Sequence, residues 1–439
     1  MAAPGIVLAA PSSGSGKTLA TLGLLAHLVR RGVDVASAKV GPDYIDPAFH
    51  AAATGRPCPN LDAWAMRPAT LAGLVAGLSH GAELVVCEGV MGLFDGAAVA
   101  SGEHAGSTAD VAALTGWPVV LVVDARGMSA SAAAVVAGFA RFRPDVAIKG
   151  VIFNKVSGER HRRLISEALS AACPEVQQLG FLPPLPQLAL PSRHLGLVQA
   201  CEHPDLAAFF DTAARAVAAH VDVDALLALA RPAVLGGAMQ PPVPPLGRHV
   251  AVARDEAFAF AYPAVLDGWH RAGVRLSFFS PLAGEAPAGD ADAVYLPGGY
   301  PELHAGLLSA GGFLPGLRDA AARGAVVFGE CGGYMVLGRA LTDAEGRAWP
   351  MAGLLPVETS FKARKLHLGY RRAVLGWDGP LGRAGQEWRG HEFHFASVTA
   401  EGDAPPLFTV SDAAGSDLGR SGLRVGKVMG SFVHLIDRA

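Results

Sequence analysis

The stretch that decides the fold of the first half of this chain is Ile6-Val7-Leu8-Ala9-Ala10-Pro11-Ser12-Ser13-Gly14-Ser15-Gly16-Lys17-Thr18. Its apolar start predicts a buried strand, its small residues predict a tight turn, and the residues from Lys17 to about Arg31 predict a helix. Backbone amides at such a turn point at phosphate oxygens, the lysine adds positive charge, and the threonine hydroxyl can ligate Mg²⁺. Although Pro11 stands where the strict motif has glycine, we predict that ATP phosphates bind at Ser13, Gly14, Ser15, Gly16, Lys17 and Thr18.

Further β-branched runs, at 33–40, 84–86, 119–123 and 151–153, alternate with helical stretches rich in alanine and leucine. Apolar runs spaced by helices indicate parallel strands covered on both faces, so we expect residues 1–235 to form a doubly wound α/β domain. Prolines over 236–247 predict a linker, because proline removes amide donors and favours extended backbone. Strand patterns resume after it, and residues 248–439 are expected to form a second α/β domain.

Composition excludes several classes of protein. A chain of 439 residues exceeds the size of one hydrophobic core, which agrees with two domains. The balance of 36 Lys+Arg against 39 Asp+Glu offers no field that would attract nucleic acid, and no long apolar run or signal peptide points to a membrane. We therefore expect a cytoplasmic protein. Five scattered cysteines suggest neither disulfides nor zinc, and we expect four of them to be small buried hydrophobes.

Carboxylates follow two of the expected strands of the first domain. Glu88 ends the run 84–86, and Asp43 and Asp46 follow the run 33–40. The carboxyl edge of an open α/β sheet is where ligands collect, so we expect these side chains near the phosphate turn, where Mg²⁺ needs oxygen ligands. Asn154, after the run 151–153, could contact adenine or serve as a turn residue.

A second motif, Gly329-Glu330-Cys331-Gly332-Gly333, follows the apolar run 325–328. This spacing is the cysteine counterpart of a nucleophile elbow, in which glycines tolerate a strained turn and a helix N-terminus is expected to lower the thiol pKa. The amide of Gly332 is placed to bind an oxyanion, and the turn containing Gly299 could add a second donor. His434, on a late strand-like segment, is our candidate for the base.

His391 and His394 also belong to an expected strand of the second half. Strand residues three apart face opposite ways, which argues against a shared zinc ion. We assign the two histidines either to the lining of a glutamine pocket or to a contact between domains.

With both motifs identified, the chain resembles the cobyrinic acid a,c-diamide synthase family over nearly its whole length. The segments that carry the resemblance are 15–18, 41–47 with His50, 88–96, 329–333, 389–394 and 430–434. The first half is also similar to dethiobiotin synthetase, whose lysine after the second strand matches Lys39 in placement.

The resemblance implies an ATP domain joined to a class I glutamine amidotransferase domain. Together they would amidate the a and c carboxylates of a corrin, hydrogenobyrinic or cobyrinic acid, in cobalamin biosynthesis, using ATP, Mg²⁺ and glutamine. A homodimer is the assembly we consider. Metal binding would fall to Thr18, Asp46 and Glu88, and substrate binding or activation to Lys39, Asp43, Tyr44 and Asp46.

One departure concerns the glutaminase site. Many class I glutaminases carry a glutamate two residues after the histidine, whereas this chain has Ile436. The residue that would orient His434 is therefore open, with Asp437 and Glu392 as candidates.

Three other functions would use part of this set of residues. The nearest is an amidotransferase for another tetrapyrrole, of the nickel-sirohydrochlorin or cobyric acid type. A P-loop partitioning or regulatory ATPase would leave Cys331 and His434 without a role, and a thiol hydrolase with a vestigial nucleotide domain would not need Lys17 and Thr18.

Overall fold

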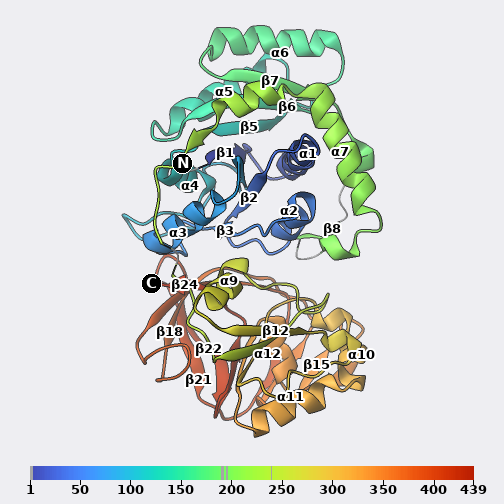
Figure 1. The fold of residues 1–439 in the computed structure, drawn as a ribbon, viewed down its shortest axis with the longest axis vertical. Coiled ribbons are helices and arrows are strands. Elements are labelled where there is room, and N and C mark those ends of the chain that lie inside the picture. The colour runs from blue at the N-terminus through green and yellow to red at the C-terminus, as the bar shows by residue number, and fades with distance from the viewer. Residues whose placement is uncertain (1–2, 189–191, 194–195, 239) are drawn as a thin grey trace. The chain divides into compact units, whose positions relative to one another are not determined.

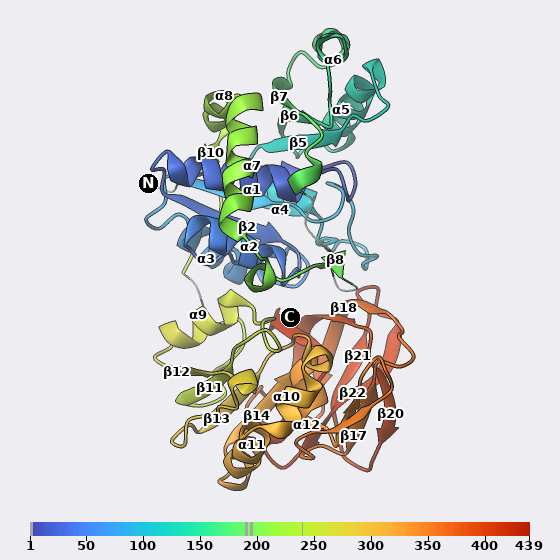
Figure 2. The ribbon, with the colours of Figure 1, turned by 90° about the vertical axis from the view of Figure 1, so that its right-hand side faces the viewer.

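The computed structural model describes residues 3–188, 192–193, 196–238 and 240–439. The chain folds into two compact units, each seen from two directions in Figures 1 and 2. Unit 1 comprises Met1–Trp64, Pro68–Gly96 and His104–Met239, and unit 2 comprises Ala65–Arg67, Ala97–Glu103 and Gln240–Ala439. The main division thus falls inside the proline-rich segment, and two short segments of the first half belong to unit 2.

Unit 1 is built on an eight-stranded sheet with the order β3-β2-β4-β1-β5-β6-β7, in which β10 adds to β1. The strands of this order pair in parallel, and β10 is antiparallel. Their bounds are β1 Pro4–Ala9, β2 Val35–Val40, β3 Asn60–Leu61, β4 Leu84–Glu88, β5 Val119–Asp124, β6 Ile148–Asn154, β7 Gln177–Leu182 and β10 Arg231–Pro232, and a separate hairpin joins β8 (Ser192–Arg193) and β9 (Gly196–Leu197). The predicted parallel sheet is confirmed.

Helices cover both faces of this sheet: α1 and α7 lie side by side on one face, with α3 and α4 on the other (Figure 1). A Cβ added to Gly23 of α1 would lie 2.8 Å from the carbonyl oxygen of Ala213 in α7, so the two helices approach closely. The helices are α1 Lys17–Arg30, α2 Asp46–Thr54, α3 Pro68–Leu78, α4 Thr108–Thr115, α5 Ala130–Phe142, α6 Glu159–Ala172, α7 Leu206–His220 and α8 Val223–Leu229, with short 3₁₀ turns at Pro186–Leu188 and Ala200–Glu202.

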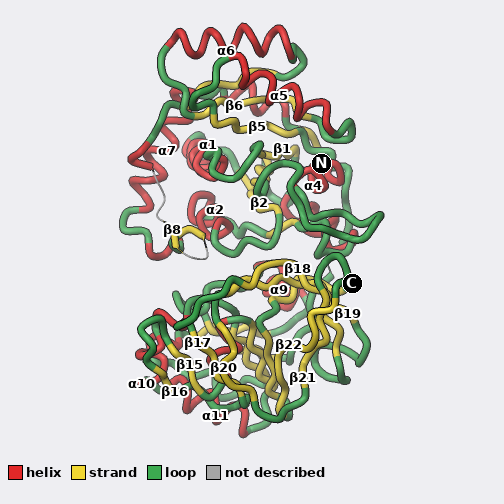
Figure 3. The backbone as a smooth tube through the Cα atoms, turned by 180° about the vertical axis from the view of Figure 1, so that it is seen from behind, coloured by secondary structure: helices red, strands yellow, loops and turns green. Residues whose placement is uncertain are grey.

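Unit 2 contains a ten-stranded sheet with the order β12-β11-β13-β14-β23-β22-β21-β18-β19-β24, and strands dominate this unit in Figure 3. The sheet is parallel from β12 to β23 and antiparallel from there to β24. Its strands are β11 His249–Ala253, β12 Arg275–Phe279, β13 Ala293–Leu296, β14 Val326–Glu330, β18 His367–Leu375, β19 Glu387–His394, β21 Pro406–Ser411, β22 Asp417–Val425, β23 Val428–Ser431 and β24 His434–Arg438. The antiparallel part brings the end of the chain back to the parallel strands.

A second, four-stranded sheet of unit 2 has the order β16-β15-β17-β20. These strands are β15 Ala340–Thr342, β16 Ala348–Pro350, β17 Val357–Ser360 and β20 Ser397–Glu401. The helices of the unit are α9 Pro263–Arg271, α10 Ala305–Ala310, α11 Phe313–Ala322 and α12 Gly332–Leu337, with 3₁₀ turns at Pro281–Ala283 and Pro301–Leu303.

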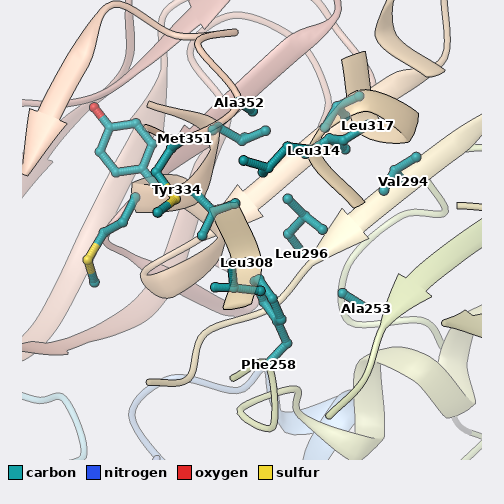
Figure 4. Packing of buried hydrophobic residues seen from close by; sticks show 14 of the residues in the cluster. Ala253, Phe258, Val294, Leu296, Leu308, Leu314, Leu317, Tyr334, Met351 and Ala352 are labelled. Carbon is teal, nitrogen blue, oxygen red and sulfur yellow. The ribbon is translucent and has the colours of Figure 1, made fainter. Parts of the chain in front are cut away.

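The core of unit 2 lies between the parallel strands and helices α10, α11 and α12. Figure 4 shows Val294 and Leu296 of β13 packed against Leu308, Leu314 and Leu317 of the helices. Burial of such side chains is the main favourable term for folding this half.

The proline-rich segment is partly packed on unit 2. Val243 and Leu246 are buried, and Nε1 of Trp269 in α9 donates to the carbonyl oxygens of Val243 at 2.9 Å and Pro244 at 3.1 Å. The second part of the expected linker is therefore fixed to α9.

The structure tests the expectation that four of the cysteines are small buried residues. Cys58, Cys87 and Cys173 are buried as expected, but Cys201 is exposed because it lies in a short surface turn, which corrects the prediction for that residue.

Within the described part of the chain, no helix combines the length and apolar character needed to cross a membrane.

Two neighbouring leucines of α10 provide a test of this core. Leu308 is fully buried whereas Leu307 is 60% exposed. We expect Leu308→Ala to lower the free energy of unfolding by about 2–5 kcal/mol, because it removes buried surface and leaves a cavity. Leu307→Ala should change it by less than about 0.5 kcal/mol. Urea unfolding followed by fluorescence measures both, and equal losses would contradict this packing.

Candidate active sites

The turn between β1 and α1 is shaped by two glycines. Gly14 and Gly16 have φ of 78° and 89°, left-handed values that favour glycine. A Cβ on Gly16 would lie 2.1 Å from Nδ2 of Asn154, so a side chain does not fit there. Gly16 is also the N-cap of α1, which places Lys17 and Thr18 in the first turn of the helix.

Asn154, one of the predicted ATP-binding residues, is buried at the end of β6. Its Nδ2 donates to the carbonyl oxygen of Ser15 at 2.9 Å, and its Oδ1 accepts from the backbone N–H of Lys155 at 2.8 Å. The bond from Nδ2 braces the turn at Ser15, and the bond to Oδ1 holds the amide itself in place. Binding of ATP by Asn154, including contact with adenine, stays a prediction.

Glu88 is the centre of a buried charge cluster at the carboxyl end of β4. Its Oε1 accepts hydrogen bonds from Oγ1 of Thr18 at 2.6 Å, Nζ of Lys39 at 3.0 Å and Nζ of Lys17 at 3.1 Å. Its Oε2 lies 2.7 Å from Nε2 of His50. The turn after β1 and the end of β2 thus meet at one carboxylate, as the expected sheet edge requires.

Lys39 joins Asp46 to the same cluster through a hydrogen bond from Nζ to Oδ2. Burial alone would lower the pKa of Lys39, but the carboxylates of Asp46 and Glu88 outweigh it and hold this pKa well above its ordinary value. Burial and the neighbouring Lys39 lower the pKa of Lys17. Burial would raise the pKa of Glu88, yet Lys39 and Lys17 hold it well below its usual range. Glu88 is therefore ionised at neutral pH.

Of the two carboxylates Asp46 and Glu88, Asp46 is the one that protonates first as the pH falls. Its burial, together with the charge of Asp43, raises its pKa to about 6 despite the bond from Lys39. Oδ1 of Asp43 accepts from the backbone amides of Ile45 at 2.8 Å and Asp46 at 3.0 Å, and this fixes the start of α2. Tyr44 is half-buried between them. Contact of Asp43 and Tyr44 with a substrate stays a prediction.

In unit 2, Cys331 occupies a strained turn between β14 and α12. It has φ 47° and ψ −105°, which is rare for a residue with a side chain and typical of a nucleophile elbow. Its backbone N–H donates to the carbonyl oxygen of Ser431 in β23 at 2.8 Å, so the elbow is fixed to the neighbouring strand.

The electrostatics of Cys331 differ from the prediction. Burial and the carboxylate of Glu302 raise the pKa of its thiol, and the bond from the Gly332 amide offsets only part of this. The expected lowering fails because α12 has six residues and the thiol is 2% exposed, so the loss of hydration dominates. At rest, the nucleophile is a neutral thiol.

His434 is the first residue of β24 and is fully buried. A Cβ on Gly298 would lie 2.9 Å from Nε2 of His434 and 3.2 Å from Cβ of Cys331, so the imidazole and the thiol border the same small space. Burial, with the nearby His391 and His394, lowers the pKa of His434 to about 3. The imidazole is therefore neutral at physiological pH and able to accept the thiol proton.

The predicted oxyanion donors are adjacent to each other. A Cβ on Gly332 would lie 3.1 Å from the backbone nitrogen of Gly299 and 2.9 Å from Cδ of Pro301. The turn after β13 therefore faces the turn that holds the nucleophile. The structure brings Cys331, His434, Gly299 and Gly332 together, while their catalytic roles stay predictions.

Both sequence-based candidates for orienting His434 are engaged elsewhere. Asp437 accepts from Nη2 of Arg67 at 2.7 Å and from its backbone N–H at 2.9 Å. Glu392 accepts from Nε of Arg371 at 2.6 Å and lies 2.8 Å from Nε2 of His394. A different carboxylate, that of Glu330, has Oε2 3.9 Å from Nδ1 of His434.

Sequence reasoning gave no site role to Glu330, or to His50, which entered only as part of the family resemblance. His50 lies in α2 and contacts Glu88 at the end of β4, 38 residues further along the chain. Local sequence patterns do not show that these two residues meet, so the contact could be found only in the structure. The signal for Glu330 was present: it ends an apolar strand just as Glu88 does, and only Glu88 was used.

Among the described residues, His367, Glu392 and His394 have atoms close enough to share a metal ion. The rings of His367 and His394 are stacked at 4.7 Å, and His394 stacks on Phe432 at 3.8 Å. Nδ1 of His394 lies 3.0 Å from the carbonyl oxygen of Ala396, and its Nε2 is bonded to Glu392. These contacts describe a hydrogen-bonded stack.

His391 lies opposite His434 across the β19–β24 pair. Burial, with Arg371, lowers the pKa of His391 to about 3. It therefore adds no charge beside the base, and its assignment to a glutamine pocket stays a prediction.

Each half of the chain matches a known protein family. Residues 6–198 match the CobQ/CobB/MinD/ParA nucleotide binding domain, and residues 249–438 match the CobB/CobQ-like glutamine amidotransferase domain. The chain is 55% identical to hydrogenobyrinate a,c-diamide synthase of Brucella anthropi over 99% of this chain and 98% of that one. It is 53% identical to the Sinorhizobium sp. protein of that name over 99% of each chain, and 52% identical to the Rhodobacter capsulatus one over 98% of each. The chain belongs to the hydrogenobyrinate a,c-diamide synthase family.

Proposed function

We propose that this chain is a carbon–nitrogen ligase that amidates the a and c side-chain carboxylates of hydrogenobyrinate in cobalamin biosynthesis, using ATP and glutamine. The observation that carries the proposal is the presence of two sites on one chain, the Lys17–Glu88 cluster and the Cys331–His434 pair. Ammonia does not displace hydroxide from a carboxylate in water, so phosphate activation and ammonia release need each other.

The alternatives fit less well. The relatives are named for a,c-diamidation of hydrogenobyrinate, which favours this substrate over cobyrinate and over nickel-sirohydrochlorin or cobyric acid chemistry. A partitioning ATPase would leave the elbow of Cys331 and the buried His434 beside it without a task.

In the glutaminase half, Cys331 gives its thiol proton to Nε2 of His434 and the sulfur attacks the carboxamide carbon of glutamine. The amides of Gly332 and Gly299 stabilise the oxyanion that forms. The carbon–nitrogen bond then breaks, and His434 returns the proton to the leaving ammonia. Water hydrolyses the thioester to glutamate and regenerates the thiol.

In the synthetase half, a corrin carboxylate attacks the γ-phosphorus of ATP and displaces ADP, which gives an acyl phosphate. Ammonia then attacks the carbonyl carbon of the acyl phosphate, inorganic phosphate leaves, and the nitrogen loses a proton to give the carboxamide. Lys17 stabilises charge on the transferring phosphoryl group from the first turn of α1. Lys39, held protonated by Asp46 and Glu88, is placed to neutralise the substrate carboxylate.

Mg²⁺ fits the oxygen donors of this site. The hydroxyl of Thr18 and the carboxylate of Glu88 are adjacent, and both are ligands that Mg²⁺ accepts. Asp46 is bonded to Lys39, so we assign it first to the substrate side and second to the metal. When bound, the ion would neutralise phosphate charge.

The division of labour can be tested with Cys331→Ala. We expect glutamine-driven amidation to fall by at least about 10³-fold, because the nucleophile is gone, while ammonium-driven amidation is retained. Products from cobalt-free and cobalt-containing substrate are identified by mass spectrometry. Cys201→Ala is the matched control, since that thiol is exposed. Loss of both activities in Cys331→Ala would contradict the proposal.

The nucleotide site is tested by Lys17→Met. Removal of the charge should lower glutamine-driven and ammonium-driven amidation alike by roughly 10²- to 10³-fold. The control is Lys149→Met, which removes an exposed lysine of the same unit. Amidation at the wild-type rate in Lys17→Met, measured as phosphate release and amide product, would exclude this role.

A further inference from the structure

Glu330 is a buried carboxylate that the glutaminase steps above leave without a task. It is the last residue of β14, directly before Cys331, and it is 2% exposed. Its Oε1 accepts from the backbone N–H of Leu435 at 2.9 Å, and its Oε2 accepts from the hydroxyl of Tyr295 at 2.6 Å. Burying a carboxylate costs free energy, and an apolar residue would end this buried strand without that cost. The carboxylate of Glu330 therefore calls for an explanation other than packing.

The imidazole of His434 lies between this carboxylate and the nucleophile. Its Nε2 borders the space that it shares with Cβ of Cys331, and its Nδ1 lies 3.9 Å from Oε2 of Glu330. Leu435, whose amide holds the other carboxylate oxygen, directly follows His434 in β24. The carboxylate is thus tied to the same strand as the base.

The reaction creates a charge at this point. When His434 takes the thiol proton it becomes a buried imidazolium, which burial and the neighbouring His391 and His394 disfavour. A carboxylate beside Nδ1 keeps Nε2 aimed at the sulfur and stabilises the cation. Asp437 and Glu392 are held by arginines, as described above.

We propose that Glu330 is the positioning residue of His434, replacing the glutamate that many class I glutaminases carry two residues after the histidine. This inference rests on the proposed glutaminase function and adds the residue that orients its base. The order of groups is Cys331, His434, Glu330 and Tyr295, in which Tyr295 of β13 holds the carboxylate.

Tyr295 also gives the proposal a distinctive pH signature. Burial raises the pKa of Glu330 to about 7, and the bonds from Tyr295 and Leu435 limit the rise. Because the ionised form is the one that supports His434, glutamine hydrolysis should increase with pH through this value. Loss of the Tyr295 hydroxyl raises the pKa of Glu330 further, so the acid limb of the pH profile should move to higher pH.

The titratable and charged groups around Cys331, His434 and Glu330 come from several elements. They are Tyr262 before α9, Tyr295 on β13, Glu302 after the oxyanion turn, and His391, Glu392 and His394 on β19. Of these, only Tyr295 is described with a hydrogen bond to Glu330, so Tyr295→Phe changes the environment of Glu330 directly.

The experiment compares Glu330→Gln, Tyr295→Phe and wild type in glutamine hydrolysis from about pH 5 to about pH 9, with ammonium-driven amidation as a second readout. We expect Glu330→Gln to lower kcat by roughly 10- to 100-fold with little change in KM, and to remove the acid limb. Tyr295→Phe should keep the plateau rate and shift the acid limb upward. Ammonium-driven amidation should be unchanged in both.

Glu345→Gln, which alters an exposed glutamate of the same unit, is the matched control for the charge change. A wild-type rate and pH profile in Glu330→Gln would overturn the proposal, as would an equal loss at every pH with the acid limb in place. If Glu330→Gln proves unstable in thermal unfolding, an unmoved limb in Tyr295→Phe overturns it instead. If wild type releases no ammonia from glutamine, the proposed function itself is refuted. If Cys331→Ala loses glutamine-driven activity as expected but Glu330→Gln keeps the wild-type rate and pH profile, only this inference is refuted.

Discussion

Each candidate site contains one carboxylate buried at the carboxyl end of a parallel strand. Glu88 ends β4 in unit 1, and Glu330 ends β14 in unit 2. Burial takes water from both groups, and a charge in such a place must be compensated by what surrounds it. The two sites differ mainly in how that compensation is made.

Around Glu88 the compensation is ionic. Lys17, Lys39 and His50 all contact its oxygens, and the result is a carboxylate that stays ionised well below its ordinary pKa. Around Glu330 the donors are a phenol and a backbone amide, both neutral, and the pKa rises to about 7. The first arrangement suits a site that holds cations and phosphates steadily. The second suits a group whose charge matters while a neighbour carries a proton.

Much of this organisation is legible in the sequence because it depends on local patterns. The apolar runs predict β1, β4 and β5 to within about two residues at each end, and the glycine-rich turns predict where Lys17 and Cys331 lie. These features need only strand periodicity and turn chemistry. His434 was found because a cysteine elbow implies a base.

The rest depends on contacts between residues distant in sequence. Asn154 braces the turn at Ser15 across 139 positions, and Leu435 reaches Glu330 across 105, so neither partner could be read from spacing. The antiparallel strands β18 and β22 carry weak periodic signals because few of their residues are buried. The prediction of a lowered thiol pKa was wrong for a similar reason, because the burial of Cys331 is set by packing from several elements.

The charge states of Cys331 and His434 before the reaction explain why the groups around these two residues are important for the proposed chemistry. Burial raises the pKa of Cys331 and lowers that of His434, so at rest the proton stays on sulfur and both groups are neutral. The thiolate and the imidazolium therefore arise only within the reaction, as the sulfur closes on its target. Groups that meet those charges as they form, the amides of Gly299 and Gly332 on one side and Glu330 on the other, then contribute to the transition state more than to the resting enzyme.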